Sequence, residues 1–187
     1  MKCILEHLEA VSECTVAAFF FNARGGQLEH SLEGCYRSLL HQMLEQIPRL
    51  RNLLRITNVP TDGQSWELQV VRAYLRQAVL HLRHESLVLM VDALDECDHQ
   101  EIRTMVEFLD GLTAETVLQN ISFNVCLASR HYPNVSISFC ATLRVEGTVA
   151  HTRDIFDYVQ ENLHIEPEGH RRALLEAVMQ RSQGVFM

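Results

Sequence analysis

Three acidic side chains follow one apolar run in the middle of the chain. The run is Leu87–Val91, and Asp92, Asp95 and Glu96 come directly after it. An unbroken apolar run with β-branched members predicts a strand that is buried on both faces of a sheet. Ligands of open α/β sheets bind at the carboxyl ends of the strands. Carboxylates crowded at that edge repel one another, and a bound cation would relieve the repulsion.

Mg²⁺ is the cation that fits these acids best. Proteins bind Mg²⁺ through one or two carboxylates and share it with substrate phosphates. The competing interpretation is structural, with Asp95 and Glu96 starting a surface loop and Asp92 capping the next element. The rest of the chain has to decide between the two, because a short motif alone is weak support.

Strands and helices are predicted to alternate around this run. Further strands are expected over Val16–Phe21 and Asn124–Ala128, and a weaker fourth over Ala141–Val145. Apolar residues at helical spacing, with Ser31 and Asp98 as N-caps, predict the helices. These helices are expected over residues 1–8, 31–47, 48–54, 66–84, 98–112, 152–163 and 167–183. Glu101 three residues after Asp98 is typical of a capping box. Alternating strands and helices indicate a parallel sheet covered on both faces.

The composition limits the class of protein. The 187 residues carry 16 basic and 24 acidic side chains, a net charge of −8, which argues against a nucleic-acid or anionic-membrane surface. No apolar run approaches the roughly 20 residues of a membrane-spanning helix. Six cysteines are scattered without a C-x-x-C pair, which is typical of a reducing compartment, so a cytoplasmic location is expected.

Several segments together resemble one family. Residues 87–98 are similar to the Walker B segment of NACHT-type P-loop NTPases, especially the fungal group with a nephrocystin-3-like N-terminal domain. Residues 124–133 resemble the sensor 1 strand with its arginine. Residues 16–26 and 31–44 resemble the stretch after the nucleotide loop, and residues 143–163 and 181–187 the approach to the helical extension. The resemblance implies a three-layer α/β fold of the P-loop NTPase type, with a partial core over 1–150 and the start of the helical extension over 151–187.

The resemblance also implies roles for four side chains. Asp92 would hold Mg²⁺, and Asp95 and Glu96 stand where the family places acids that position or activate the attacking water. Which of these two does so is left open by one sequence. Arg130 would contact the γ-phosphate of ATP or GTP, for which a guanidinium is suited. The structural alternative for Arg130 is a surface ion pair.

One required motif is missing from the sequence. A P-loop NTPase needs G-x-x-x-x-G-K-[ST] to cradle the phosphates, but Gly25 and Gly26 are followed by Gln27 and Leu28, and no Gly-Lys-Ser/Thr occurs. Residues 1–7 resemble the helix that begins just after that loop, so the chain is expected to start downstream of it. We therefore expect no tight nucleotide binding and no ATP hydrolysis by this chain alone. We also expect a sheet that lacks the strand next to the sensor 1 strand.

The expected function is a fragment of a signal-transducing NTPase that acts as a nucleotide-dependent switch or oligomerisation module. Its expected partners are other domains or full-length relatives, with homo-oligomers in the full-length context. One alternative is a non-enzymatic module that pairs with relatives through an open sheet edge. A weaker one is a Mg²⁺-dependent phosphoesterase built on the three acids. His81 and His84 share a helix face, but no third metal ligand is evident.

Overall fold

The computed structural model describes residues 2–11, 14–53, 67–130, 137–138, 140–145, 148–162 and 168–182. The chain divides into two compact units, Met1–Phe139 and Cys140–Met187. The first unit contains the described strands and the candidate site residues, and the second contains two helices. Each unit is described by itself.

The first unit is built on a parallel sheet of three strands. They are β1 (Thr15–Phe20), β2 (Leu87–Asp92) and β3 (Phe123–Leu127), in the order β1-β2-β3. Leu89 of β2 is opposite Ala17 on one side and Val125 on the other. The three stronger predicted strands and the α/β class are therefore confirmed, and the parallel arrangement is compatible with a P-loop-like fold.

The predicted helices of the first unit are present with small shifts at their ends. They are α1 (Lys2–Val11), α2 (Leu32–Gln46), α3 (Arg49–Leu53), α4 (Leu68–Leu80) and α5 (His99–Leu118), with 3-10 turns η1 (Gln27–His30) and η2 (Leu94–Glu96). Ser31 caps α2 as predicted, because its Oγ accepts a hydrogen bond from the Gly34 N–H at 3.3 Å. Trp66, at the predicted start of the helix that precedes β2, lies outside the described residues.

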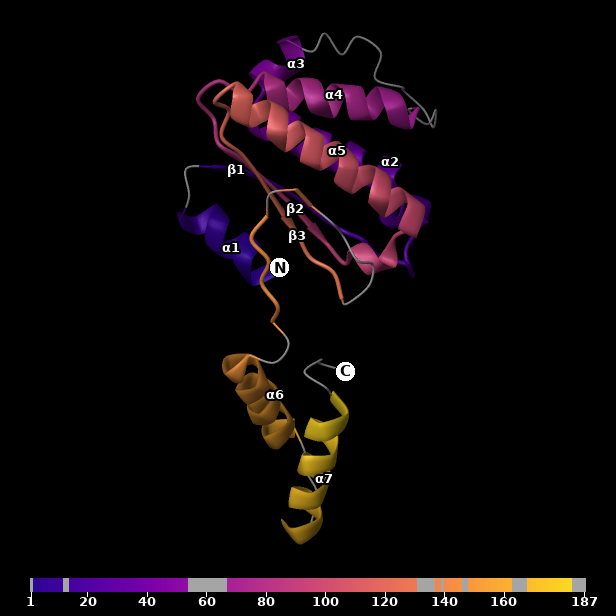
Figure 1. Ribbon diagram of the computed structural model, residues 1–187, viewed down its shortest axis with the longest axis vertical. Coiled ribbons are helices and arrows are strands. Elements are labelled where there is room, and N and C mark those ends of the chain that lie inside the picture. Colours follow the sequence, from indigo (N-terminus) through magenta and orange to yellow (C-terminus); the bar gives the residue numbers. More distant parts are fainter. Residues whose placement is uncertain are drawn as a thin grey trace. The chain divides into compact units, whose positions relative to one another are not determined.

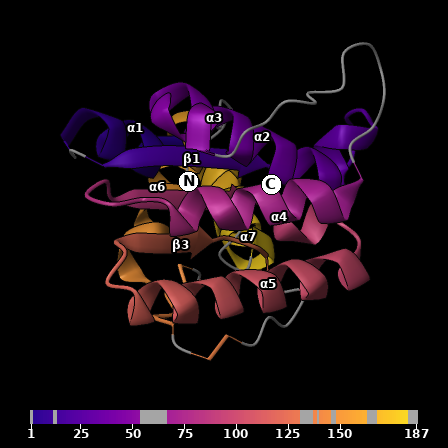
Figure 2. The same ribbon diagram turned by 90° about the horizontal axis from the view of Figure 1, so that it is seen from above.

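The core lies between one face of the sheet and the helices α2, α4 and α5 (Figure 1). Leu87, Leu89 and Val91 point to this face and are completely buried, as the alternation of side chains along a strand requires. Helix α2 contacts β1, and α5 contacts β3. Figure 2 shows α4 between α2 and α5, which completes the helical layer.

The other face of the sheet carries less cover. Helix α1 lies on this side and contacts β1 (Figure 1). Val16 and Met90 are buried here, whereas Phe20 is 41% exposed and Asn124 is exposed. Helices thus lie on both sides of the sheet, as predicted, with the thinner layer opposite the main core.

The outer edge of β3 is unpaired in the described part of the chain. Leu87 N–H bonds to Ser122 O and Ala128 N–H to Val91 O, both at 2.9 Å, so alternate residues of β3 bond to β2. The backbone groups of the intervening residues, Phe123, Val125 and Leu127, point away from β2. Among the described hydrogen bonds, none reaches these outward groups.

The prediction of a fourth strand over Ala141–Val145 is wrong. Residues 141–145 are described and form no strand, and Leu143 is 83% exposed. A strand is stable only when a neighbour pairs its backbone and its apolar side chains are covered. Within the described residues, no strand pairs with this segment.

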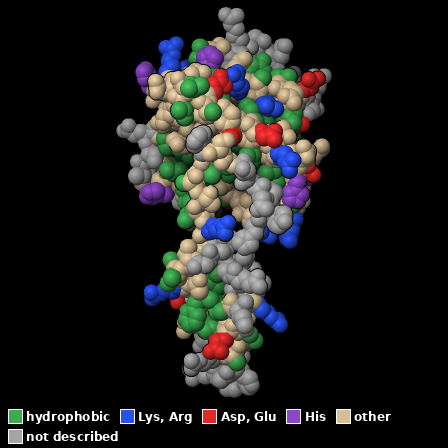
Figure 3. All heavy atoms as spheres, in the orientation of Figure 1, with side chains coloured by type: hydrophobic (Ala, Val, Ile, Leu, Met, Phe, Trp, Pro, Cys, Tyr) green, Lys and Arg blue, Asp and Glu red, His purple; other side chains and the backbone are tan. Residues whose placement is uncertain are grey.

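The second unit contains α6 (Val149–Asn162) and α7 (Glu168–Ser182), which contact each other, and Ile155 of α6 is buried. Helix α6 begins earlier than predicted, because Thr148 rather than Thr152 caps it: the Thr148 Oγ1 accepts the His151 N–H at 3.3 Å. Figure 3 shows apolar side chains gathered on this unit, and mixed acidic and basic side chains over the visible face of the first unit. Within the described ranges, no helix has the length and apolar character to cross a membrane.

Candidate functional site

A strained turn follows Asp92 at the carboxyl end of the central strand. Ala93 has φ 56° and ψ 45°, a left-handed conformation that costs a residue with a side chain about 1–3 kcal/mol. The Asp92 Oδ1 accepts the Ala93 N–H at 2.9 Å. The buried Leu94 donates its N–H to Ala128 O at 3.1 Å, which holds the turn against the end of β3. The turn directs the next two acids toward the neighbouring strand ends.

Asp95 joins the ends of β2 and β3. Its Oδ1 accepts the Arg130 N–H at 3.1 Å and the Ser129 Oγ–H at 3.5 Å, and its Oδ2 lies 3.5 Å from the Arg130 Nε. The Asp95 side chain is 18% exposed and that of Arg130 is 77% exposed. The structure thus brings together two of the predicted site residues, in the ion pair that was the structural alternative for Arg130.

Glu96 joins the same turn to the loop after β1. Its Oε2 accepts the Ala23 N–H at 2.9 Å. That loop is in turn held by Glu29, which accepts the Asn22 Nδ2–H at 2.9 Å and the Gly26 N–H at 3.2 Å. Asp95 and Glu96 therefore connect the carboxyl ends of all three strands, and this bracing was not predicted from the sequence.

Most of the hydrogen-bonding capacity of Asp92 is unused within the described residues. In the described part of the chain, its half-buried carboxylate bonds only to the adjacent Ala93 N–H. A single carboxylate is enough as the protein ligand of a Mg²⁺ site whose other ligands are phosphates and water. It does not fit a site made of protein alone, since no group of three His, Cys, Asp or Glu able to hold a metal occurs among the described residues. His81 and His84, both described, form no such group either.

Glu101 acts differently from its predicted part in a capping box. Asp98 does cap α5, because its Oδ1 accepts the N–H groups of Gln100 and Glu101 at 2.8 and 3.4 Å. The Glu101 Oε2, however, accepts the Leu32 N–H at 3.0 Å and lies 3.5 Å from the Cys97 Sγ. Burial first and the Glu101 carboxylate second raise the pKa of Cys97 to about 12, so the thiol stays protonated. The Glu101 carboxylate thus bonds to the start of α2 instead of to the N-terminus of its own helix α5.

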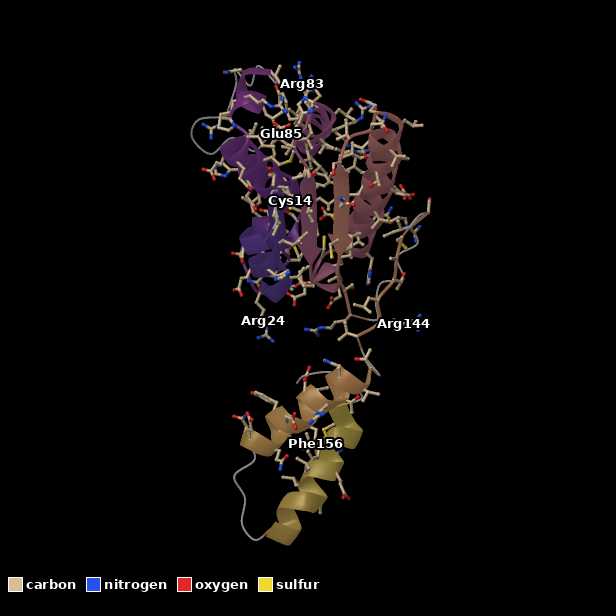
Figure 4. The ribbon with its side chains drawn as sticks, turned by 90° about the vertical axis from the view of Figure 1, so that its left-hand side faces the viewer. Cys14, Arg24, Arg83, Glu85, Arg144 and Phe156 are labelled. Atoms are coloured by element: carbon tan, nitrogen blue, oxygen red, sulfur yellow. The ribbon has the colours of Figure 1, made fainter. Side chains whose placement is uncertain are left out.

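Charged residues at the opposite end of the sheet are structural. Glu85, before β2, accepts two hydrogen bonds from the Arg49 guanidinium, with Nε to Oε1 at 2.8 Å, and a further one from the Arg83 N–H at 3.1 Å. The Arg49 hydrogen bonds are the main cause that lowers the Glu85 pKa to about 2. Figure 4 shows Glu85 and Arg83 at this end and Arg24 extending from the other, beyond β1. Arg24 is exposed and follows the carboxyl end of β1, so it lies at the same end of the sheet as the three acids.

A groove of about 510 Å³ lies away from the acids, between α4 and α5. Arg72 lies over the Phe108 ring, 4.8 Å from its centre, and Arg76 forms an ion pair with Glu115. The groove shares no lining residue with the strand ends. The candidate site is therefore defined by the side chains at the carboxyl ends of the strands.

The sequence profile described as Nephrocystin 3, N-terminal, matches residues 1–130. The chain belongs to this family. The matched region of this nephrocystin 3 N-terminal domain contains all three strands and ends at Arg130, so it includes Asp92, Asp95 and Glu96 as well. This confirms the nephrocystin-3-like part of the resemblance seen in the sequence. No curated protein matches the chain significantly.

Proposed function

We propose that this domain supplies the metal-facing half of a nucleotide site in a NACHT-type signalling NTPase, where ATP or GTP with Mg²⁺ switches the protein between states. The observation that carries the proposal is the position of Asp92 at the carboxyl end of the central parallel strand, with its carboxylate bound only to the Ala93 N–H among the described residues. Ligands of parallel α/β sheets bind at this edge.

Arg130 supports the same proposal from the next strand. Its backbone is fixed by Asp95, while 77% of its side chain is exposed and able to reach a phosphate. Asp95 and Glu96 hold the strand ends in place, and either is a candidate for positioning water once a nucleotide loosens its present hydrogen bond. Mg²⁺ would supply charge neutralisation of the phosphates when bound.

The chain lacks the groups that bind the phosphates themselves. Without G-x-x-x-x-G-K-[ST], no lysine and no nest of N–H groups surrounds the β- and γ-phosphates. The proposal therefore predicts weak nucleotide binding and no hydrolysis by these residues alone. Cysteines without a disulfide suit a cytoplasmic protein. Among the described residues, those outside any disulfide are Cys14, Cys35, Cys97, Cys126 and Cys140.

Calorimetric titration with ATP and GTP, with and without Mg²⁺, tests the proposal. We expect binding in the millimolar range that depends on Mg²⁺ and is lost in Asp92→Asn. Glu107→Gln is the matched control, because Glu107 is an exposed acid on α5, remote from the strand ends. Binding that is indifferent to Mg²⁺, or equally weakened by both substitutions, would contradict the proposal.

The unpaired edge of β3 favours a second candidate function, a non-enzymatic module that pairs with a full-length relative. The outward N–H and C=O groups of Phe123, Val125 and Leu127 offer the hydrogen bonds that an added strand uses. The segment carries no charge and no proline, the residues that commonly protect an exposed edge.

Co-purification with an intact family member separates the two functions. Val125→Pro removes an N–H that points away from β2, so it should block strand addition while retaining the β2–β3 hydrogen bonds. The module function predicts that Val125→Pro abolishes co-purification and that Asp92→Asn preserves it. Retention of the partner by a folded Val125→Pro variant would exclude pairing through this edge.

A further inference from the structure

Side chains of α2 bond to part of the outer edge of β1. Gln42 makes two hydrogen bonds to one residue: its Oε1 accepts the Ala18 N–H at 2.9 Å, and its Nε2 donates to the Ala18 O at 2.8 Å. Gln46 donates from Nε2 to the Val16 O at 2.7 Å. Ser38 accepts a second hydrogen bond from the Gln42 Nε2 at 3.0 Å, which orients the amide.

These contacts reproduce those of a neighbouring strand. Thr15 N–H bonds to Ser86 O and Phe21 N–H to Asp92 O, so alternate residues of β1 bond to β2 and Val16 and Ala18 point outward. A primary amide carries one acceptor and donors in the same relation as a peptide group. Gln42 therefore occupies both positions that a strand partner of Ala18 would use.

Helix and strand geometry explain how two glutamines reach two successive outward residues of β1. Residues four apart on a helix are separated by about 6.0 Å along its axis, and outward residues two apart on a strand by about 6.6 Å. Gln42 and Gln46 are four apart, and their targets Ala18 and Val16 are two apart in the reverse direction. Successive turns of α2 thus meet successive outward groups of β1.

We propose that Gln42 and Gln46 form an edge lock, which prevents a second copy of this chain from adding to the sheet at β1. Thr15–Phe20 is uncharged and rich in alanine, valine and phenylalanine, a composition that pairs readily with itself once its backbone is free. The lock makes β1 unavailable whether or not the domain binds nucleotide. It does not rest on the proposed function.

Hydrogen exchange at the Ala18 amide tests the first part of the proposal. The double variant Gln42→Ala/Gln46→Ala should exchange this amide at least tenfold faster than the unmodified chain. His41→Ala/Glu45→Ala is the matched control, because it truncates the side chain directly before each glutamine on the same helix. The side chains of His41 and Glu45 are 70% and 59% exposed. The control should leave the Ala18 exchange rate unchanged.

Sedimentation velocity over a range of concentrations tests the second part. Opening the lock should increase concentration-dependent self-association above the level of the unmodified chain and the control, with helical circular dichroism retained. If the double variant loses its fold, the same two measurements are made on Gln42→Leu, which preserves side-chain bulk and helix propensity. The same faster exchange and added self-association are expected. An unchanged Ala18 exchange rate in a folded variant, or accelerated exchange without added self-association, would overturn the proposal.

Discussion

Asp95 holds Arg130 by its backbone, with the carboxylate 3.1 Å from the Arg130 nitrogen and 3.5 Å from the Nε of its side chain. The backbone contact fixes the end of β3 independently of where the guanidinium points. The exposed side chain is therefore free to exchange its carboxylate partner for a phosphate without disturbing the strand. The phosphate contact proposed for Arg130 depends on this separation between a fixed backbone and an exposed side chain.

The two contacts of Asp95 should differ in their effect on stability. Arg130→Ala removes only an exposed ion pair and should lower the free energy of unfolding by less than about 1 kcal/mol. Asp95→Ala also removes the acceptor of the Arg130 N–H and should cost about 1–2 kcal/mol. Urea unfolding of both variants measures the difference. Equal losses would show that the backbone contact adds nothing.

The Arg49–Glu85 pair predicts a loss of stability in acid. The Glu85 pKa is lowered from its ordinary value of 4.5 to about 2, mainly by the Arg49 hydrogen bonds, so the folded protein favours the charged form. Its stabilising effect is complete above pH 4.5 and disappears as the pH falls toward 2. Discounted for side chains about one-third exposed, the effect is about 1 kcal/mol at pH 7.

Urea unfolding of Glu85→Gln at pH 7 and pH 3 measures this contribution. The variant should be less stable than the unmodified chain at pH 7, and the gap should narrow at pH 3. Glu107→Gln, on the exposed face of α5, should show no such convergence. A gap that stays constant between the two pH values would show that the ion pair does not set the pKa.

Two helical glycines should respond oppositely to alanine. A Cβ at Gly34 would lie 1.7 Å from the Leu28 carbonyl oxygen, whereas one at Gly111 would meet nothing within 4 Å. Gly34→Ala should therefore destabilise the domain by about 2 kcal/mol or more through the backbone shift it forces. Gly111→Ala should stabilise it by about 0.5–1 kcal/mol, because alanine is the better helix former.

Thermal unfolding followed by circular dichroism compares the two glycine variants under one set of conditions. A Gly34→Ala variant as stable as the unmodified chain would mean that α2 does not need the close approach to Leu28. A destabilised Gly111→Ala variant would mean that the α4–α5 groove is narrower than described.

The sequence predicted the parts of the fold that depend on local pattern. The runs 87–91 and 124–128 are apolar enough to identify their strands, and Ser31 and Asp98 are recognisable caps because their effect needs only the next three residues. Ala141–Val145 has strand-forming residues too, but a strand also requires a neighbour, which local pattern does not reveal.

The sequence predicted that the four candidate side chains share one end of the sheet, but it did not predict their contacts. The order of residues placed Asp92, Asp95 and Glu96 at one strand end, and the topology brought Arg130 beside Asp95. The Glu96–Ala23 bond spans 73 residues, and Glu101 bonds to a residue 69 positions away. Contacts at such separations follow from packing of whole elements, so the sequence pattern around each residue carries no sign of them.

Paramagnetic broadening by Mn²⁺ in the presence of ATP tests most directly whether Asp92 faces a metal–nucleotide site. Mn²⁺ prefers the same oxygen ligands as Mg²⁺. We expect broadening centred on the Ala93 and Arg130 amides, abolished by Asp92→Asn and unaffected by Glu107→Gln. Broadening centred on other residues, or unchanged by Asp92→Asn, would contradict it.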